Sequence, residues 1–342
     1  MSETTTTPAP SGPGESQPNV FRRFLAGSAG RNLGLVIALV LIVIVGAITG
    51  GERFLDLGNF VTIVRYGSIL GVVAIGMTFV ITAGGIDLSV GSLMGLTSVV
   101  ASLSWVQTAA TETTWVLMVV VAIAVGGLAG FINGIVIAYG KVVAFMATLA
   151  MLVAARGLAE ILAERRTLQV GDRGFILFMN ADLIGVDILI WIFAIVAALG
   201  WVLLNRTTFG RRTVAIGGNR EAARLAGINV RRHIMWLYAL SGLTAGIAAV
   251  MILGRTTAGT STHGQLYELD AIAAVVVGGT LLVGGRGTIT GTVFGVLIFA
   301  TLTNVFVQNN LTSSVQAVAK GVIIVIAVLL QQRFAKPTGR AT

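Results

Sequence analysis

Long apolar segments are the feature that most constrains the fold of this chain. Ten of them approach the roughly 20 residues that a helix needs to cross a bilayer. They lie at about 33–50, 67–83, 86–105, 115–138, 142–162, 183–204, 234–253, 270–284, 289–308 and 314–331. Only 11% of the 342 residues are charged, against roughly 25% in soluble domains. We therefore predict an all-α polytopic membrane protein with about ten transmembrane helices, because helices satisfy their own backbone polar groups in lipid.

Polar tails flank this membrane domain, which should cover residues 33–331. The tail at 1–32 begins with Thr, Pro, Ser and Gly, a composition that cannot bury a core, so we expect disorder there. A second, short tail should cover 332–342. The first apolar run follows a long polar stretch instead of opening the chain, which favours a retained first span over a signal peptide.

Basic residues are distributed unevenly between the two sides of the predicted spans. With a cytoplasmic N-terminus, fifteen Lys and Arg fall in cytoplasmic segments and six in outer segments. This bias follows the positive-inside rule and predicts that both termini and residues 205–232 face the cytoplasm. It also explains the net charge of +9 without nucleic acid as a partner.

Two predicted spans, 67–83 and 270–284, are short, and each ends in a glycine pair. The pairs, at an offset of 200 residues, are Gly84–Gly85 and Gly284–Gly285. Short, glycine-interrupted spans in matching positions point to a translocation path, so we expect two related halves with short broken helices. The glycines could instead only permit close packing. A separate stripe is interpreted as packing alone: Gly126, Gly130 and Gly134.

A charged segment, GGNREAARLAGINVRRH at 217–233, interrupts the apolar pattern. Asn219 is a good N-cap, Glu221 favours the first turn, and Gly227 is suited to end a helix. We expect a helix of about two turns at 219–226. Helices this short are marginal alone, so it should pack on something. The alternative is a solvated basic loop against anionic lipid.

Polar side chains inside the predicted spans are costly and are therefore candidate functional groups. Asp270 and Lys320 lie at similar depth and could form an ion pair that holds two spans together, or contact a transported solute. Asp87 could cap the following helix through the N–H of Ser89 or Val90, meet Arg286, or serve in gating. Two amides could line a path or bridge helices: Asn133 and Asn304.

Other chemistry has little support in the sequence. Arg156 and Glu160, four residues apart, are interpreted as a helix-surface pair. The two histidines have no metal-ligand spacing, no nucleophile–base set is visible, and cysteine is absent. We therefore expect no catalytic site, no cofactor site and no metal site.

Within the charged segment, EAARLAG resembles the EAA loop of ABC importer permeases, with Glu221, Ala222, Ala223 and Gly227 matching the motif and Arg224 lying within it. Four longer runs resemble the monosaccharide permeases of the ribose, xylose and galactose type. They are ITAGGIDLSVGSLMGL (81–96), VVAFMATLAM (142–151), GRRTVAIGGNREAARLAGINV (210–230) and YELDAIAAVVVGGTLLVGGRGTITGTVFG (267–295). The similarity runs from about residue 33 to residue 331.

The resemblance implies a permease subunit in a bacterial inner membrane that imports a ribose-like monosaccharide. It implies that two permease copies or paralogues form the channel, that an extracytoplasmic binding protein delivers the sugar, and that an ATPase with two nucleotide-binding domains docks on the coupling helix at 219–226. The chain has no G-x-x-x-x-G-K-[ST] motif, so the ATPase should be a separate chain.

A self-sufficient secondary transporter driven by an ion gradient is the alternative. It would need a buried carboxylate as coupling site, for which Asp87 is available, but it gives the EAA-like helix no purpose. An intramembrane enzyme would need a catalytic set that the sequence does not show.

Overall fold

The computed structural model describes residues 28–335, so the two predicted tails lie largely outside it. The described chain is mainly helical, with four strands of two residues each. The long helices are α2 (Ser28–Gly50), α4 (Leu57–Thr82), α7 (Val116–Ala138), α8 (Ala144–Leu162), α10 (Ile188–Arg206), α13 (Val230–Thr256), α15 (Ile289–Gln308) and α16 (Ser313–Ala335). Shorter ones are α3 (Glu52–Leu55), α5 (Val90–Ala101), α6 (Ser104–Glu112), α9 (Arg173–Met179), α11 (Thr208–Gly218), α12 (Arg220–Leu225) and α14 (Tyr267–Val277).

Two short strand pairings join the loops at one end of the bundle. Strand β1 (Leu168–Gln169) pairs antiparallel with β4 (Ala258–Gly259), and β2 (Asp182–Leu183) pairs antiparallel with β3 (Val186–Asp187). The second pairing takes up residues that the sequence assigned to the span at 183–204. The helix α10 consequently begins later, at Ile188, where the Asp187 carboxylate accepts from the Leu189 N–H at 2.8 Å.

Each predicted span has a helix at its position, but fewer than ten of the described helices have the length and hydropathy expected of a membrane span. Seven described helices are long and apolar enough to cross a membrane, and an eighth is reached if α5 and α6 form one span with a 57° bend. For α16 this measure covers only Ser313–Ile326, and α14 has only 11 residues. A count of ten spans is therefore not confirmed.

The segment predicted at 67–83 is not short. It belongs to α4, which has 26 residues. Asn59, Thr62 and Arg65 lower the hydropathy of its first turns and hid them from the sequence pattern. The expectation of two matching short helices is therefore wrong for the first half and correct for the second, where α14 stops at Val277.

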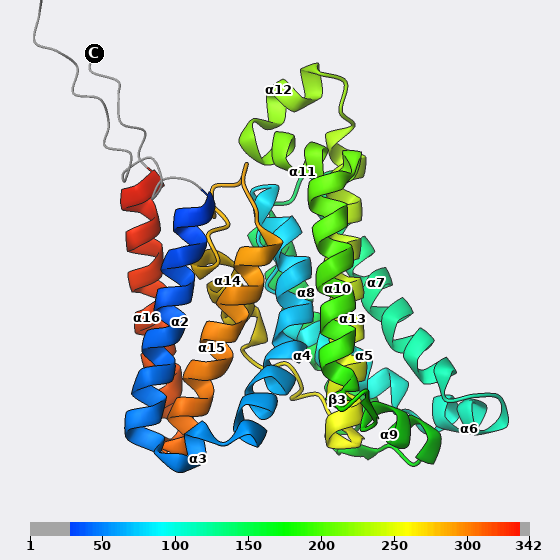
Figure 1. Cartoon of the computed structure of the whole chain (residues 1–342). Helices are drawn as coiled ribbons and strands as arrows, with labels where there is room; N and C mark the ends of the chain where they lie inside the picture. Colours follow the sequence, from blue (N-terminus) through cyan, green and yellow to red (C-terminus); the bar gives the residue numbers. More distant parts are fainter. Residues whose placement is uncertain (1–27, 336–342) are drawn as a thin grey trace, which may run out of the picture.

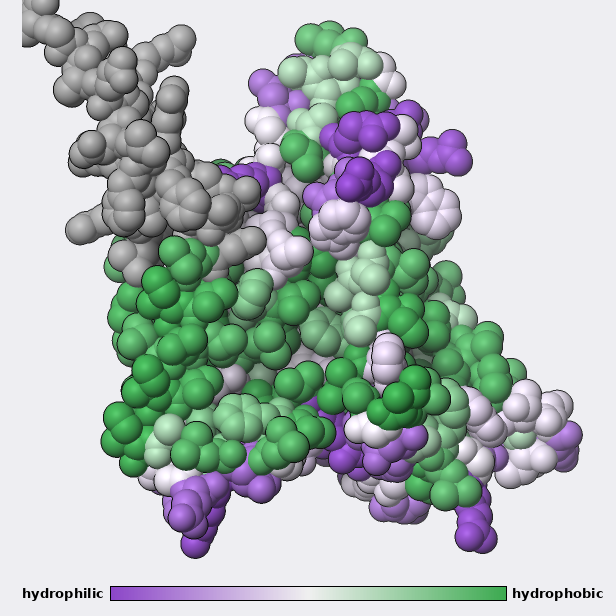
Figure 2. All heavy atoms as spheres, viewed as in Figure 1, coloured by the Kyte–Doolittle hydropathy of each residue, from purple (hydrophilic) through white to green (hydrophobic). Residues whose placement is uncertain are grey.

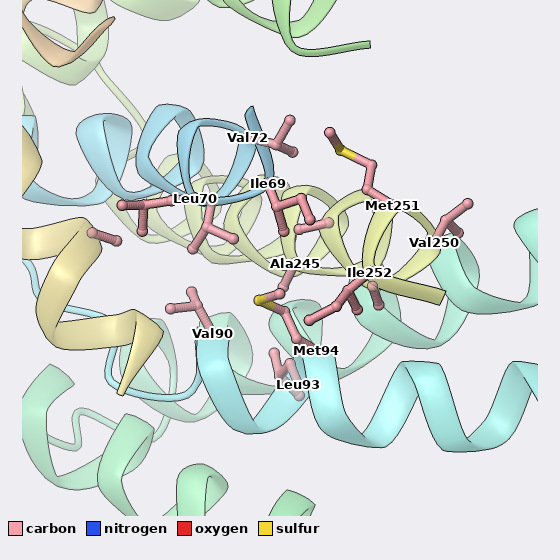
Figure 3. Packing of buried hydrophobic residues seen from close by; sticks show 14 of the residues in the cluster. Ile69, Leu70, Val72, Val90, Leu93, Met94, Ala245, Val250, Met251 and Ile252 are labelled. Carbon is pink, nitrogen blue, oxygen red and sulfur yellow. The ribbon is translucent and has the colours of Figure 1, made fainter. Parts of the chain in front are cut away.

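The core is formed around α13 and α4, whose apolar windows are the most completely buried of the candidate spans. Figure 3 shows Ile69 of α4, Met94 of α5 and Ala245 of α13 close together in this core, and Val72 and Leu93 belong to the same cluster. A helix that is apolar on all sides must be surrounded by other helices or by lipid. The apolar part of α13 is surrounded by other helices, so α13 is the central helix of the bundle.

Helix α7 packs against α13 at very short distance. Gly126 and Gly130 lie against the backbone of Gly242, and Gly134 lies against the backbone of Met235, so that any side chain at these three positions would collide. The interpretation of this stripe as packing is confirmed, and it agrees with the use of small residues at membrane helix interfaces.

The molecule has an apolar middle and two polar ends. Figure 2 shows hydrophobic residues around the middle of the bundle and hydrophilic residues at both extremities. Figure 1 shows α11 and α12 projecting at one end, near the start of α2, while α3, α6, α9 and β3 lie at the other. The charged segment is therefore displaced from the apolar layer.

Candidate functional site

The charged segment folds as the predicted short helix, α12, with its predicted N-cap. The Asn219 side-chain oxygen accepts from the Ala222 N–H at 2.9 Å. This bond satisfies one of the N–H groups that the first turn of a helix leaves without a partner. The sequence missed α11, an 11-residue helix that leads directly into Asn219.

Gly227 ends α12 as predicted. Its φ is +81°, a left-handed conformation that glycine adopts without strain. The Gly227 N–H donates to the Arg224 carbonyl at 3.0 Å, and the Ile228 N–H donates to the Ala223 carbonyl at 3.1 Å. This pair of bonds is a Schellman motif, and it fixes the angle at which the chain leaves α12 for α13.

The side chains of α12 divide between an inner and an outer face. Ala223 is buried, so of the predicted coupling residues it supports the helix from within and cannot contact a partner. Leu225, which the sequence did not single out, is 76% exposed at the tip. Arg224 and Glu221 form an exposed ion pair at 2.5 Å. The hydrogen bond from Arg224 lowers the pKa of Glu221, so both groups are charged at neutral pH.

The two glycine breaks, 200 residues apart in sequence, meet in space. The Gly285 N–H donates to the Thr82 carbonyl at 2.9 Å. A Cβ on Gly284 would lie 2.8 Å from the Gly84 nitrogen. Gly84, Gly284 and Gly285 have φ of +78°, +85° and +80°, so a side chain at any of them would be strained. The contact between the breaks is built from backbone.

Gly85 differs from its partners because its φ is not positive. A Cβ there would lie 2.6 Å from the Tyr238 hydroxyl of α13, and that hydroxyl donates to the Ile86 carbonyl at 3.3 Å. A side chain at Gly85 would therefore have to displace the Tyr238 hydroxyl, whereas its backbone angle would tolerate one.

The end of α11 joins the same contact. Gly217 lies against the Thr82 carbonyl and the Gly285 nitrogen, so closely that no side chain fits there. Gly217 precedes the N-cap of α12 by two residues. The segment that leads into α12 and both glycine breaks thus form one contact, of which Thr82 and Gly217 were missed from the sequence. The signal that could have found Gly217 is the GG pair directly before the cap.

Asp87 is fully buried just after the first break, and its hydrogen bonds are satisfied. One carboxylate oxygen accepts from the Ser89 N–H at 2.9 Å and from the Ser89 hydroxyl at 2.6 Å, and the other accepts from the Ser241 hydroxyl at 2.8 Å. The predicted contact with the Ser89 N–H is confirmed. Arg286 forms no ion pair with Asp87 in the described structure.

The two membrane amides bridge helices. The Asn133 amide of α7 donates to the Ser89 hydroxyl at 2.9 Å, which extends the network of Asp87. The Asn304 amide of α15 donates to the Asn59 side chain of α4 at 2.8 Å, and Asn59 donates back at 3.2 Å. Of the two alternatives, the described contacts support bridging for both.

Asp270 and Lys320 form the predicted ion pair. Lys320 of α16 donates to the Asp270 carboxylate of α14 at 2.7 Å, and both side chains are about one-fifth exposed. The pair connects the short helix α14 to the last described helix.

Arg156 does not pair with Glu160, so the interpretation of a helix-surface pair is wrong. Its guanidinium donates to the carbonyls of Ser261 and His263, in the loop between α13 and α14. Glu160 instead lies 3.5 Å from Arg165. An arginine side chain has five N–H donors and can bind the carbonyls of a loop. The spacing of residues on one helix does not show that a distant loop supplies the partner.

Comparison with known proteins gives matches over most of the chain. A family model described as "Branched-chain amino acid transport system / permease component" matches residues 59–329. The ribose import permease protein of Bacillus subtilis (strain 168) is 40% identical over 308 residues, which cover 89% of this chain and 93% of that protein. No solved structure matches the chain.

Two further relatives show the range of sugars in their names. The ribose import permease protein of Haemophilus influenzae is 37% identical over 302 residues, 86% of this chain and 90% of that protein. The galactose/methyl galactoside import permease protein of Escherichia coli (strain K12) is 35% identical over 310 residues, 86% of this chain and 92% of that protein.

Proposed function

This chain belongs to the family of branched-chain amino acid transport system permease components, and on that premise we propose that it imports a ribose-like monosaccharide as the membrane subunit of an ABC importer. The observation that carries the proposal is the alignment with ribose import permeases over 86–89% of the chain. It is a multi-pass inner-membrane protein and not an enzyme.

The proposed complex contains three further components. A separate ATPase with two nucleotide-binding domains supplies the energy, an extracytoplasmic binding protein delivers the sugar, and a second permease copy completes the channel. The helix α12 lies at the same end of the bundle as the start of α2. We place this end and both termini in the cytoplasm, in agreement with the excess of basic residues there.

Force enters through α12 in this proposal. The exposed side chains of Glu221, Arg224 and Leu225 contact a groove of the ATPase, while the buried Ala223 holds the helix on α11 and α13. Gly217 transmits movement of the segment to Thr82 and Gly285, because these groups are in direct backbone contact. Both breaks then move together with α12.

The sugar path is proposed to open at these breaks. Gly84, Gly85, Gly284 and Gly285 supply the close backbone approach. Asp87, Ser89 and Asn133 hold the start of α5 in place through their hydrogen-bond network, and Asn304 keeps α15 against α4. A carboxylate with three donors is well satisfied, which supports a positioning role over ion coupling.

Uptake by proteoliposomes tests the function. The permease is reconstituted with its cognate ATPase and binding protein, and entry of labelled ribose, arabinose and galactose is measured with ATP inside. We expect ribose uptake that requires ATP, the ATPase and the binding protein. Uptake driven by an ion gradient without the ATPase would establish the secondary transporter instead, and ATP-dependent uptake of another substrate alone would exclude the ribose-like assignment.

A further inference from the structure

A pocket of about 500 Å³ lies between α12 and the nearby ends of α4, α7 and α13. Its mouth carries four basic side chains, from Lys141, Arg220, Arg224 and Arg231, and one acid, Glu221. Glu221 is already paired with Arg224. Three cations at the mouth therefore have no acidic partner within ion-pair distance in residues 28–335.

Lys141 occupies this mouth in an unusual backbone conformation. It follows α7 with φ of +57°, in the left-handed region that favours glycine. Strained backbone positions persist where the surrounding structure enforces them and often mark functional sites. Its side chain is exposed at the pocket, beside the turn into α8.

Part of the inner wall is apolar and buried, and it consists of Val80, Ile137, Ile234 and Leu237. Gly84 and Gly85 of the first break complete the lining beside them, so the pocket adjoins the proposed sugar path. One side continues onto the outer surface of α8 through Val143, which lines the pocket and is 69% exposed. Met146, one turn further along α8, is 58% exposed. An apolar surface thus leads from the pocket into the layer where lipid tails lie.

This combination fits one kind of molecule. A free phosphate would use the cations but not the apolar wall. An acidic protein loop would not extend onto the lipid-facing side of α8. An anionic phospholipid has a phosphate for the basic mouth, and a glycerol and acyl chains for the wall and the adjoining helix face.

We propose that this pocket binds the headgroup of an anionic phospholipid of the cytoplasmic leaflet. The proposal rests on the cytoplasmic orientation of α12 proposed above. Because Arg220, Glu221 and Arg224 belong to both the pocket and α12, the bound lipid also braces the coupling helix on its membrane side.

Native mass spectrometry of the purified permease complex tests the binding. Phosphatidylglycerol and phosphatidylcholine with identical acyl chains are titrated against wild type and against Lys141→Gln/Arg231→Gln. Each basic residue near an anionic surface contributes about fivefold in affinity, so the double variant should bind phosphatidylglycerol about 25-fold more weakly. The matched control, Arg211→Gln/Arg212→Gln, removes the same charge from α11 outside the pocket and should stay near wild type.

Several results would overturn the proposal. They are equal affinity of wild type for the two lipids, unchanged phosphatidylglycerol binding by the pocket variant, or an equal loss in the control. Full displacement of the lipid by excess inorganic phosphate would identify a free-phosphate site instead. Lys141→Arg/Arg231→Lys should restore binding, which separates lost charge from misfolding. The assay involves no transport, so its failure leaves the uptake test of function unaffected.

Discussion

Gly217 and Gly218 are neighbours at the end of α11 with opposite surroundings. A Cβ on Gly217 would collide with the Thr82 carbonyl, whereas a Cβ on Gly218 would meet nothing within 4 Å. We predict that Gly217→Ala separates α11 from the breaks, lowers sugar uptake at least tenfold and destabilises the protein by about 1–3 kcal/mol. Gly218→Ala should transport like wild type. The checks are uptake and thermal unfolding in detergent, and equal uptake by the two variants would refute the transmission route.

The buried carboxylate of Asp87 can be tested for charge and for hydrogen bonding separately. Asp87→Ala leaves the Ser89 and Ser241 donors without an acceptor, which should cost about 2–4 kcal/mol. Asp87→Asn keeps an acceptor for Ser89, and the Ser241 hydroxyl can turn to accept from the new amide. We expect it to unfold near the wild-type temperature and to retain uptake. A stable but inactive Asp87→Asn would show that the negative charge itself is needed for gating.

For single residues, the sequence predicted local contacts better than contacts between distant segments. Asn219, Gly227 and the Asp87–Ser89 contact were found because capping is local, with donor and acceptor at most five residues apart. Thr82 and Gly217 were missed because their importance comes from a contact across the fold. A threonine carbonyl has no sequence signature, since every residue carries the same group.

Among the helices, α12 has a proposed role, docking of the ATPase, that a single substitution can test. Leu225 is 76% exposed and makes no core contact that its loss would disturb. We predict that Leu225→Asp leaves membrane insertion and unfolding temperature unchanged but abolishes ATP-dependent uptake, because an apolar tip becomes a buried charge in the ATPase groove. Pull-down of the ATPase by the variant measures docking directly.

Gly227→Val is the companion change in α12. A β-branched residue at φ of +81° is strained and should shift the exit angle of the helix. It should weaken ATPase docking, while insertion is retained because the position lies outside the spans. If both variants dock and transport normally, α12 is a basic helix against lipid and has no coupling role.

The ion pair between α14 and α16 is suited to a double-mutant cycle. Asp270→Asn and Lys320→Met each leave one charge without its partner, and the double variant removes both. We expect each single variant to be less stable than the double, with a coupling energy of about 1 kcal/mol since both groups are partly exposed. Zero coupling, measured by unfolding in mixed micelles, would show that the pair does not fasten α14 to α16.

Element positions followed from hydropathy, but element ends did not. Each predicted span coincides with a helix because about 20 apolar residues allow few alternatives. The polar first turns of α4 and the bend between α5 and α6 were not predicted, since both depend on neighbours that cover polar groups. The short α14 was predicted because its glycines lie in the sequence itself.

For the whole molecule, orientation is the testable property. The chain has no cysteine, so single cysteines report without background. Ala215 on α11 and Ile184 in the β2–β3 turn are both exposed and lie at opposite ends of the bundle. We predict that an impermeant thiol reagent labels Ile184→Cys in intact cells and labels Ala215→Cys only after lysis. The reverse pattern would invert the proposed topology.

The hydrogen bond from Gly285 to Thr82 joins main-chain atoms at both ends. Any residue offers a carbonyl, and every residue except proline offers an N–H. Mutation of the side chains around this bond therefore leaves it in place, provided that the glycines stay small. A related transporter could therefore change the side chains that contact its cargo and still keep this main-chain hydrogen bond.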